Sequence, residues 1–331
     1  MRQTVKLLAA WLSLALFAPD GGLEGAEPLR VRVGYPSPSA SFSPLFVAKE
    51  GGAFEKYGLA PELLYLQGVQ ITQVHVSGQV DFTVTGAPLP LRAAVEGADL
   101  VLVAGSIDKF IYKLIARPGI GAPAGLKGKT IGITTFGSLP DVAIRLVLRR
   151  WGMNPDSDVT LVQVGRMSDM VVALSAGKID AGVISDPTSF QAEKIGMKRL
   201  LDMADVDVEF ANVAVAVSRS YAKARREMVL RFLKAYIEGT RLFMTDRELA
   251  VRALRKYTGA ADREILEKTY DLFASKYIKK VPVLSVRSVE NTLAMIADRS
   301  PKARGRRAAE FIDASFIAEL EASGFIRSVW P

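Results

Sequence analysis

Few side chains of this chain could do covalent or metal chemistry. Its 331 residues include no cysteine and a single histidine, His75. Disulfides, thiolate metal sites and cysteine nucleophiles are therefore excluded, and so is any metal site that needs two histidines. We expect no catalytic residue, no bound metal and no cofactor. His75 falls in a predicted helix that follows Gly68, and we expect it to be structural or to face solvent.

Hydrogen-bonding groups are instead concentrated in short loops. Alternate residues of one loop are serines, namely Ser37, Ser39, Ser41 and Ser43. Another loop leads into a helix that begins near Ser138 and Pro140, whose free backbone N–H groups and positive dipole end favour an anion. These loops predict a site that holds an anion or a polar head group without an arginine. Helix capping and turn formation explain the same serines equally well.

Five loops follow predicted strands and lead into predicted helices, at residues 35–43, 68–72, 85–88, 134–140 and 185–189. Ligands of parallel α/β sheets bind outside the carboxyl ends of the strands, where such loops lie. The candidate ligand-binding residues are Ser39, Ser41, Phe42, Gly68, Gly86, Ala87, Phe110, Thr135, Phe136, Ser138 and Asp186. The three phenylalanines form either an apolar wall of the site or ordinary core. Asp186 either accepts a hydrogen bond from a ligand amine or caps the next helix.

The elements that must position these loops occur twice in the chain. Residues 29–100 and 129–200 share the order of their strands, helices and turns, and four pairs of turn residues are each 99 positions apart. These pairs are Gly78 and Gly177, Asp81 and Asp180, Pro88 and Pro187, and Gly97 and Gly196. Strands of about five residues alternate with helices of about a dozen. Each copy therefore predicts an α/β lobe with a mainly parallel sheet.

We predict two such lobes, joined by a hinge of two strands, with a ligand cleft between them. Strand-like runs occur at 100–104, 114–116 and 213–217. They place the passage into the second lobe near Arg117 and the return near Asn212. The first lobe then comprises residues 27–116 and 213–331, and the second comprises residues 117–212. We expect further helices on the first lobe or over the hinge, around 225–245, 262–275, 288–297 and 308–323.

The N-terminus has the residue order of a secretory signal. Arg2 and Lys6 precede a run without charge from Leu7 to Ala18, and small residues follow. We expect residues 1–26 to be a signal peptide that is cleaved near Ala26, and the mature protein to be periplasmic. The apolar run is shorter than the roughly 20 residues that span a bilayer, so we expect no stable membrane insertion. Without cysteine, we expect no lipoprotein anchor.

The formal net charge of +8 is spread along the chain, which indicates solubility and a mild preference for anions. One basic run, Lys302, Arg304, Arg306 and Arg307, lies between the last two predicted helices. It has neither the aromatic partners nor the matching fold of a nucleic-acid site. We expect a solvated surface there and no nucleic-acid partner.

Several segments resemble the periplasmic substrate-binding proteins of the nitrate, sulfonate and taurine ABC-importer family, including its relatives that bind thiamine pyrimidine precursors. The matching segments are Val31-Arg-Val-Gly-Tyr-Pro, Pro44-Leu-Phe-Val-Ala-Lys-Glu-Gly-Gly-Ala-Phe-Glu-Lys-Tyr-Gly-Leu, Val76-Ser-Gly-Gln-Val-Asp-Phe, Leu126-Lys-Gly-Lys-Thr-Ile-Gly-Ile, Ala173-Leu-Ser-Ala-Gly-Lys-Ile-Asp-Ala and Asp186-Pro. The resemblance implies a type II periplasmic-binding-protein fold and, as partners, an ABC permease and ATPase. We expect a monomer that binds a small organic anion or zwitterion, such as a sulfonate or taurine, and that is not an enzyme.

Three alternatives stay open. The ligand could be a thiamine pyrimidine precursor or another aromatic heterocycle, or the chain could be a sensor that reports to a membrane receptor. The third alternative is an enzyme of the same fold. Chorismate dehydratases work in the cytoplasm, whereas this chain has an export signal. The related pyrimidine synthases need a reactive histidine and a cysteine-rich iron site, which a chain without cysteine cannot build.

Overall fold

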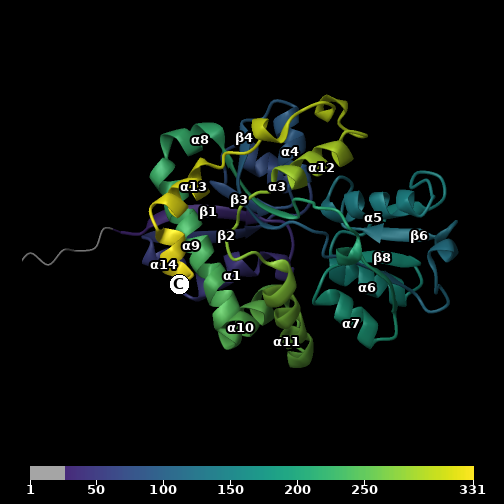
Figure 1. Ribbon diagram of the computed structural model, residues 1–331. Helices are drawn as coiled ribbons and strands as arrows, with labels where there is room; N and C mark the ends of the chain where they lie inside the picture. The colour runs from purple at the N-terminus through teal and green to yellow at the C-terminus, as the bar shows by residue number, and fades with distance from the viewer. Residues whose placement is uncertain (1–26) are drawn as a thin grey trace, which may run out of the picture.

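The computed structural model describes residues 27–331 and shows two α/β lobes side by side, each with its own five-stranded sheet (Figure 1). The strand order is β2-β1-β3-β10-β4 in the first sheet and β7-β6-β8-β5-β9 in the second. The predicted α/β architecture with two lobes is confirmed. The predicted signal peptide, residues 1–26, lies outside the described residues.

The two sheets have the same topology. The first consists of β1 (Leu29–Tyr35), β2 (Leu59–Tyr65), β3 (Phe82–Thr85), β4 (Leu100–Ile107) and β10 (Val213–Ser218). The second consists of β5 (Lys113–Ala116), β6 (Thr130–Ile133), β7 (Thr160–Gln163), β8 (Ala181–Ile184) and β9 (Lys198–Asp202). In each sheet one interior strand, β10 or β5, is antiparallel to both neighbours. Three neighbouring strands of each sheet, β2-β1-β3 and β7-β6-β8, are paired in parallel, so their carboxyl ends meet along one edge.

The duplicated aspartates have the same structural role in the two lobes. Oδ2 of Asp81 accepts a hydrogen bond from the backbone N–H of Arg32 at 2.8 Å, and Oδ2 of Asp180 accepts one from Thr130 at 2.9 Å. The backbone N–H of each aspartate donates in return to the carbonyl of the same residue. Each aspartate thereby extends the pairing between the first and third strand of its sheet. The repeat of 99 residues thus marks equivalent positions in two similar folds.

The chain crosses between the lobes at residues 108–112 and 206–212. The first crossing lies earlier than the predicted passage near Arg117, because residues 113–116 form β5, which pairs with β8 and β9 of the second sheet. A short apolar run reads as a strand in either lobe, and only its partners decide which. The two crossings are joined to each other by a hydrogen bond of 2.7 Å from Phe210 N–H to the carbonyl of Asp108 and by stacking of Phe110 on Phe210 at 4.3 Å.

Helices cover the faces of both sheets. In the first half of the chain they are α1 (Ser43–Glu50), α2 (Ala53–Lys56), α3 (Gln70–Val76) and α4 (Pro88–Val95), and in the second lobe α5 (Leu139–Arg150), α6 (Met167–Ser175) and α7 (Thr188–Lys194). After β10 follow α8 (Arg219–Ala224), α9 (Arg226–Thr245), α10 (Arg247–Thr258), α11 (Arg263–Leu272), α12 (Val286–Ile296), α13 (Ser315–Ala322) and α14 (Phe325–Val329). Helix α10 was not among the predicted helices; Asp246 caps it by accepting a hydrogen bond from the N–H of Leu249. Helix α13 begins at Ser315, later than the helix predicted around 308–323.

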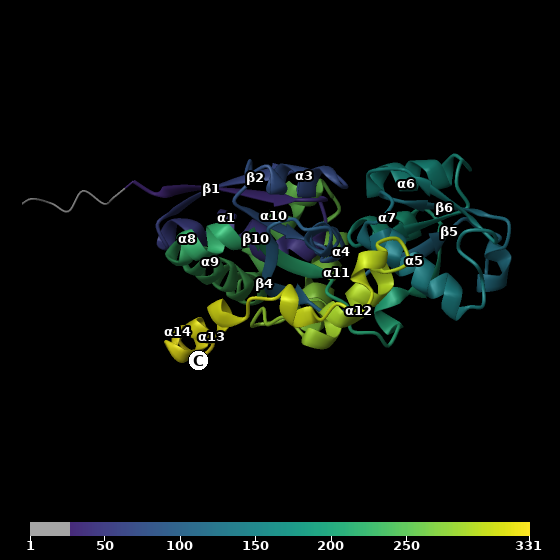
Figure 2. The same ribbon diagram turned by 90° about the horizontal axis from the view of Figure 1, so that it is seen from above.

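Each lobe has its own hydrophobic core. In the first lobe, the long helix α9 packs against α1 so closely that there is no room for a side chain at Gly239. A Cβ at this position would lie 2.4 Å from the carbonyl oxygen of Pro44. Phe232 of α9 stacks on Phe82 of β3, with the ring centroids 4.0 Å apart. In the second lobe, α5 covers one face of the sheet. Figure 2 shows α12, from the C-terminal part, reaching α5 across the boundary between the lobes.

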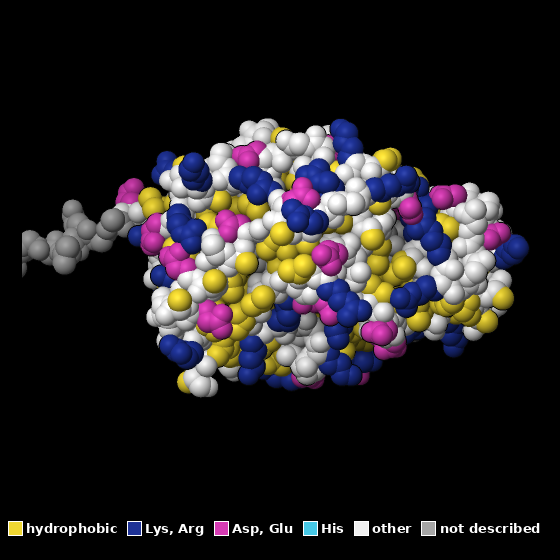
Figure 3. Space-filling view, turned by 45° about the horizontal axis from the view of Figure 1, so that its top comes forward, with side chains coloured by type: hydrophobic (Ala, Val, Ile, Leu, Met, Phe, Trp, Pro, Cys, Tyr) yellow, Lys and Arg dark blue, Asp and Glu magenta, His cyan; other side chains and the backbone are white. Residues whose placement is uncertain are grey.

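The surface carries charges of both signs. Figure 3 shows Lys and Arg side chains interspersed with Asp and Glu over one face. In the basic run, Lys302 pairs with Glu96 at 2.7 Å and Arg306 with Glu310 at 2.7 Å, and Arg304 and Arg307 are exposed. Within residues 27–331, no helix is both long and apolar enough to cross a membrane.

His75 is buried in α3, as a structural residue. Only 3% of its surface is exposed, and its Nδ1 lies 3.0 Å from Oγ1 of Thr83. Burial lowers the pKa of His75 to about 4, although Asp81 acts to raise it. The folded state therefore holds a neutral imidazole near neutral pH, whereas an unfolded chain takes up a proton near pH 6.5.

We predict that His75 makes the protein less stable in mild acid. Because the unfolded state binds the extra proton between about pH 6.5 and pH 4, the free energy of unfolding falls by about 2 kcal/mol from pH 7 to pH 5 on account of this group. Urea unfolding of the wild type and of His75→Gln at both pH values measures the effect. The variant should lose less stability over this interval; an equal loss in both proteins would contradict the prediction.

Candidate functional site

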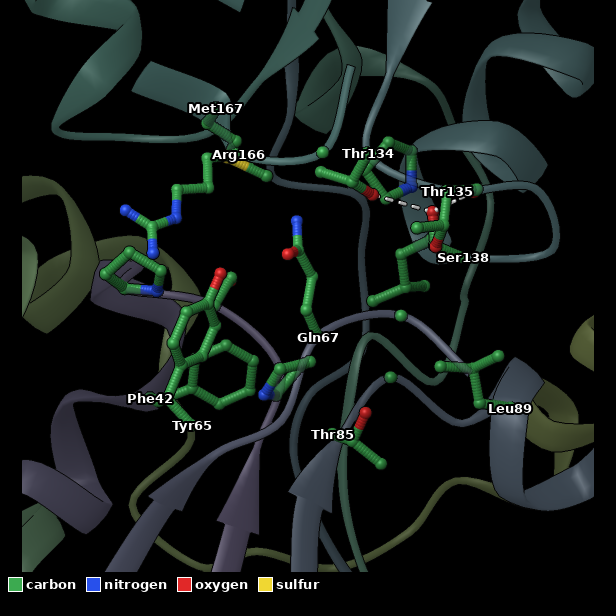
Figure 4. Close-up of a pocket in the computed structure, with 18 of the residues that line it drawn as sticks. Phe42, Tyr65, Gln67, Thr85, Leu89, Thr134, Thr135, Ser138, Arg166 and Met167 are labelled. Atoms are coloured by element: carbon green, nitrogen blue, oxygen red, sulfur yellow. Dashed lines mark hydrogen bonds between the residues drawn. The ribbon is translucent and has the colours of Figure 1, made fainter. Parts of the chain in front are cut away.

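A cavity lies between the lobes, where the carboxyl ends of the parallel strands of the two sheets face each other (Figure 4). Its walls come from the segments after β1, β2 and β3 in the first lobe and after β6 and β7 in the second. The lining residues are Pro36, Ser37, Pro38, Phe42, Tyr65, Gln67, Gly68, Thr85, Gly86, Leu89, Tyr112, Thr134, Thr135, Ser138, Leu139, Pro140, Gly165, Arg166 and Met167. The cavity has a volume of about 60 Å³. It therefore suits a small ligand.

Aromatic rings form one wall of the cavity. Phe42 and Tyr65 line it from the first lobe (Figure 4). Tyr35 lies behind them, with its ring centroid 6.5 Å from that of Phe42 and 5.8 Å from that of Tyr65. Phe46 supports Tyr35 edge-on at 5.2 Å. These packed rings offer a rigid apolar surface against which an alkyl chain or a planar ring can lie.

Arg166 brings a positive charge to the cavity from the second lobe. It precedes α6, and its Cζ lies 5.9 Å from the centroid of the Tyr65 ring, so the guanidinium and the phenol meet across the cleft. Burial raises the pKa of Tyr65, and Arg166 acts to lower it. Among residues 27–331, no carboxylate lies within ion-pair distance of Arg166. A guanidinium that is not neutralised beside a cavity is suited to bind an anion in the forked geometry of two N–H groups.

Two buried hydroxyl groups in the cavity wall have no hydrogen-bond partner among the described residues. They are Oγ1 of Thr85, at the end of β3, and Oγ1 of Thr135, after β6. A buried polar group without a partner costs about 1–3 kcal/mol. Both threonines line the same cavity, so a ligand that reaches their hydroxyl groups can supply the missing partners. Figure 4 shows the amide of Gln67 between them and Arg166, reaching from the end of β2 into the cavity.

The loop that leads into α5 provides few free backbone donors. The backbone N–H groups of Phe136, Gly137 and Ser138 already donate within the second lobe, to Gln163, Asp141 and Thr135. The hydroxyl of Ser138 also donates to the carbonyl of Thr135, at 2.6 Å. In addition, the negative charge of the Asp141 carboxylate lies in the first turn of α5, where it partly neutralises the positive end of the helix dipole. The cavity also contains an arginine that was not among the predicted site residues, since Arg166 lines it.

Five of the predicted site residues line the cavity: Phe42, Gly68, Gly86, Thr135 and Ser138. Ala87 is buried behind it, where its N–H donates to the carbonyl of Ala211 in the second crossing. Phe110 is buried in the hinge against Phe210. Phe136, predicted as a possible wall, is 38% exposed and faces Arg299 at 5.5 Å. These last residues are not in the cavity wall, because the loops turn their side chains to other surfaces.

Ser39, Ser41 and Asp186 belong to a buried polar contact between the lobes. Oγ of Ser39 lies 2.9 Å from Oγ of Ser41 and 2.9 Å from Oγ of Ser185 in the other lobe. The N–H of Ala40 donates to the carbonyl of Asp186 at 3.4 Å. These serines therefore hold the lobes together instead of lining the cavity.

The Asp186 side chain is occupied by an ion pair. Its Oδ2 accepts from Nζ of Lys113 at 2.8 Å, and both side chains are 0% exposed. Lys113 also lies 3.5 Å from Asp202 and donates to the hydroxyl of Tyr277 in the first lobe at 3.3 Å. Burial acts to lower the pKa of Lys113, but Asp186, Tyr277 and Asp202 outweigh it, so the pKa is raised and the lysine is charged. Asp186 is thus not available to a ligand amine.

Four residues that line the cavity were not among the predicted site residues: Tyr65, Gln67, Thr85 and Arg166. The duplication contained the signal for Arg166. The loop after β7 in the second copy is the counterpart of the loop after β2, which was included as residues 68–72. Gly165 and Gly68 both have a left-handed backbone, with φ of 90° and 60°. Because the two loops occupy equivalent positions in the two lobes, the repeat places Arg166 beside the cleft.

This chain is similar in sequence to a known protein family and to several known proteins. A sequence model of the family described as NMT1/THI5 like matches residues 39–250. A candidate binding protein of Brucella abortus (strain 2308) is 30% identical over 238 residues, which cover 71% of this chain and 72% of the relative. A candidate aliphatic sulfonates-binding protein of Escherichia coli (strain K12) is 27% identical over 267 residues, which cover 78% of this chain and 80% of the relative.

Solved structures show the same fold. The alkanesulfonate-binding protein SsuA from Xanthomonas axonopodis pv. citri, bound to MOPS, has a TM-score of 0.72 and 22% identity, over 88% of this chain and 100% of that protein. The desulfurization enzyme DSZB has a TM-score of 0.67 and 14% identity, over 89% of this chain and 99% of that protein. The predicted periplasmic-binding-protein fold is confirmed. The fold alone does not separate binding from catalysis, since both classes share it.

We predict opposite effects on stability and binding when the Thr85 hydroxyl is removed. Thr85→Val should leave the free energy of unfolding unchanged or raise it, because the hydroxyl has no partner. It should weaken ligand binding by roughly 5- to 10-fold, the value of one hydrogen bond. Urea unfolding and calorimetry with ethanesulfonate measure the two quantities.

Thr240→Val is the matched control for this variant. Thr240 is as buried as Thr85, but its hydroxyl donates to the carbonyl of Tyr236 at 2.9 Å within α9. The control should lose stability and keep its affinity. If Thr85→Val loses stability and binds normally, its hydroxyl has no role in ligand binding.

We predict that Asp186→Asn destabilises the protein without changing its binding specificity. The substitution leaves the buried Lys113 with an incomplete partner, which costs about 3–5 kcal/mol. Denaturant unfolding measures this loss, and calorimetry on the folded variant measures affinity for taurine and ethanesulfonate. A variant that loses affinity for taurine alone would show that Asp186 binds the ligand amine after all.

Proposed function

The chain belongs to the NMT1/THI5-like family, and on this basis we propose that it is the solute-binding component of an ABC-type importer. Its ligand is a small organic anion or zwitterion, of the sulfonate or taurine class. The observation that carries this proposal is the guanidinium of Arg166, which has no carboxylate partner among residues 27–331 and lines a cavity between two lobes. The sulfonate-binding relative and the MOPS-bound SsuA support the same ligand class.

Each lobe supplies a different part of the recognition. The first lobe contributes the aromatic wall of Phe42 and Tyr65 together with Gln67, and the second contributes Arg166 and Thr135. A ligand whose anionic group meets Arg166 while its organic part lies on the aromatic wall contacts both lobes only when they are closed. Such contacts favour the closed state by the difference in affinity between the open and closed forms. The closed clamp is the form that docks on the permease.

The hinge is positioned to respond to this closure. Tyr112 belongs to the first crossing and lines the cavity. The next residue, Lys113, is held by Asp186 of the second lobe and Tyr277 of the first. A ligand that packs against Tyr112 therefore touches the segment about which the lobes move.

We propose binding and not catalysis. The single histidine, His75, is buried in α3 against Thr83 and does not line the cavity. The hydroxyls of the cavity wall have no general base beside them, since the wall contains neither histidine nor carboxylate. In the cell, we propose export by the N-terminal signal, cleavage near Ala26, and action as a periplasmic monomer with a permease and an ATPase.

A second ligand class is favoured by one specific observation. The aromatic wall of Phe42 and Tyr65, which Tyr35 packs from behind, suits a planar ring as well as an alkyl chain. A thiamine pyrimidine precursor or another aromatic heterocycle would then lie on this wall, with Gln67 and the threonine hydroxyls as its hydrogen-bond partners. Such a ligand has no anionic group for Arg166, and this difference separates the two classes.

Calorimetry with the mature protein tests the proposal. The panel is ethanesulfonate, taurine, nitrate, benzenesulfonate and a thiamine pyrimidine precursor. We expect binding of a sulfonate and a loss of roughly 10- to 100-fold in Arg166→Met, the value of a charge-assisted hydrogen bond. Lys178→Met is the matched control, because it removes one positive charge from the other end of α6, where Lys178 is exposed.

The outcomes separate the ligand classes. Equal loss of affinity in both variants would show a general effect of net charge, and not a contact with Arg166. Binding of the pyrimidine alone, unchanged in Arg166→Met, would support the second class. If the wild type binds no member of the panel, the sulfonate class is refuted, and native mass spectrometry of the purified protein then identifies the ligand.

A further inference from the structure

Four glycines mark where the two lobes meet around the cavity. In each case a side chain of the opposite lobe occupies the space that a Cβ atom would take. The contacts are Gly68 with Thr135 at 2.8 Å, Gly86 with Leu139 at 2.4 Å, Gly137 with Arg92 at 2.5 Å, and Gly165 with Gln67 at 3.1 Å, measured from an ideal Cβ position. Real Cβ atoms do not approach other atoms closer than about 3.0 Å. A Cβ at Gly68, Gly86 or Gly137 would lie inside this limit, and only at Gly68 and Gly86 is the atom that it meets not the end of a long flexible side chain, so the closed arrangement depends most on the absence of a side chain at these two positions.

Gly86 differs from the other three glycines in its backbone. Gly68, Gly137 and Gly165 have φ between 60° and 90°, a left-handed conformation that any other residue would strain. Gly86 does not have a positive φ, so alanine is compatible with its backbone. Only at this position does a substitution test the contact between the lobes separately from the local fold.

The Leu139 side chain cannot easily move away from a Cβ at residue 86. Such a Cβ would lie 2.5 Å from Cγ of Leu139 as well as 2.4 Å from its Cδ1. Rotation about χ2 moves the Cδ atoms but leaves Cγ in place. Leu139 is also buried, at the first residue of α5, where it belongs to the core of the second lobe. Rotation about χ1 does move Cγ, but it would take the side chain out of its place in that core, so the clash is relieved by moving the lobes apart or by repacking the core.

Leu139 also lines the ligand cavity. Its side chain fills the space between Gly86 of the first lobe and the start of α5, and so limits the cavity at that end. The same contact that lets the lobes close thus takes up volume that a longer ligand would need.

We propose that the contact of Leu139 with Gly86 is the stop at which the lobes close and the element that limits ligand size. The part concerning closure is independent of the ligand, whereas the part concerning size rests on the proposed sulfonate class. With Leu139 seated on Gly86, the closed cleft accepts short-chain anions. Without the leucine side chain, the cleft still closes and accepts longer chains.

Closure is tested without any ligand, because the chain has no native cysteine. Ser39 and Ser185 lie on opposite lobes with their Oγ atoms 2.9 Å apart, so Ser39→Cys with Ser185→Cys should form a disulfide in the closed state. In this background, Gly86→Ala should slow disulfide formation roughly 10-fold or more, the effect of overpacking by one methyl group. Adding Leu139→Ala should restore the rate. Gly121→Ala is the matched control, since its Cβ would meet no atom within 4 Å, and it should have no effect.

Ligand size is tested by calorimetry with ethane-, butane- and hexanesulfonate. Leu139→Ala should raise the preference for hexanesulfonate over ethanesulfonate roughly 15- to 60-fold, because about two to three methylene groups fit into the vacated space. Gly86→Ala should weaken all three, and the double variant should bind again.

The two tests fail in different ways. No disulfide in the background protein, an undiminished rate in Gly86→Ala, or no restoration by Leu139→Ala would overturn the proposed stop. Restored closure with an unchanged chain-length preference would overturn the size limit. If closure behaves as expected and no sulfonate binds the wild type, the closure stop stands, while the size limit fails together with the proposed ligand class.

Discussion

The architecture depends on one topological constraint: in each lobe, the strand that directly follows a crossing between the lobes lies in the interior of the sheet. Strand β10 returns from the second lobe and enters the first sheet between β3 and β4, and β5 enters the second sheet between β8 and β9. Both strands have hydrogen-bond ladders on two sides, so neither can leave its sheet without unfolding the lobe. Relative motion of the lobes is therefore confined to residues 108–112 and 206–212. The same connections turn the carboxyl ends of both sets of parallel strands toward each other, which creates the cavity.

Polar groups at the lobe boundary are divided between holding the lobes and binding a ligand. The Lys113–Asp186 ion pair is fully buried and closed within the protein, and Ser39 is paired with Ser185. In the part of the chain that the structure describes, Arg166 has no carboxylate partner and lies against the Tyr65 ring, and the hydroxyls of Thr85 and Thr135 have no hydrogen-bond partner. Burial is costly for both kinds of group, but only the second kind leaves hydrogen bonds for a ligand to complete. This division distinguishes the binding site from its supports.

Glycines make the close approach of the lobes possible. At Gly86 the partner side chain, Leu139, comes from the core of the other lobe, so the fit between the lobes is linked to packing within the second lobe. Conformational change in such a molecule is a choice between two packed arrangements, because a close-packed contact is either made or absent. A ligand needs to supply only the difference in free energy between them.

The sequence alone determined the two lobes, because the repeat of 99 residues and the alternation of strands and helices depend on local periodicity and turn chemistry. It also determined which loops approach the cleft, since loops that follow parallel strands share one edge of the sheet. It did not determine the lobe of residues 113–116, because an apolar run of four residues suits either sheet and only pairing with β8 and β9 decides.

Which side chains face the ligand was likewise decided by the tertiary structure. Asp186 and Arg166 are both charged residues in loops beside the cleft, and their local sequences do not distinguish them. Asp186 is withdrawn from the cavity by Lys113, which is distant in the sequence and reaches it through the insertion of β5, whereas no carboxylate of residues 27–331 pairs with Arg166. A side chain is available to a ligand only when no other group has satisfied it, and that depends on partners that folding brings together.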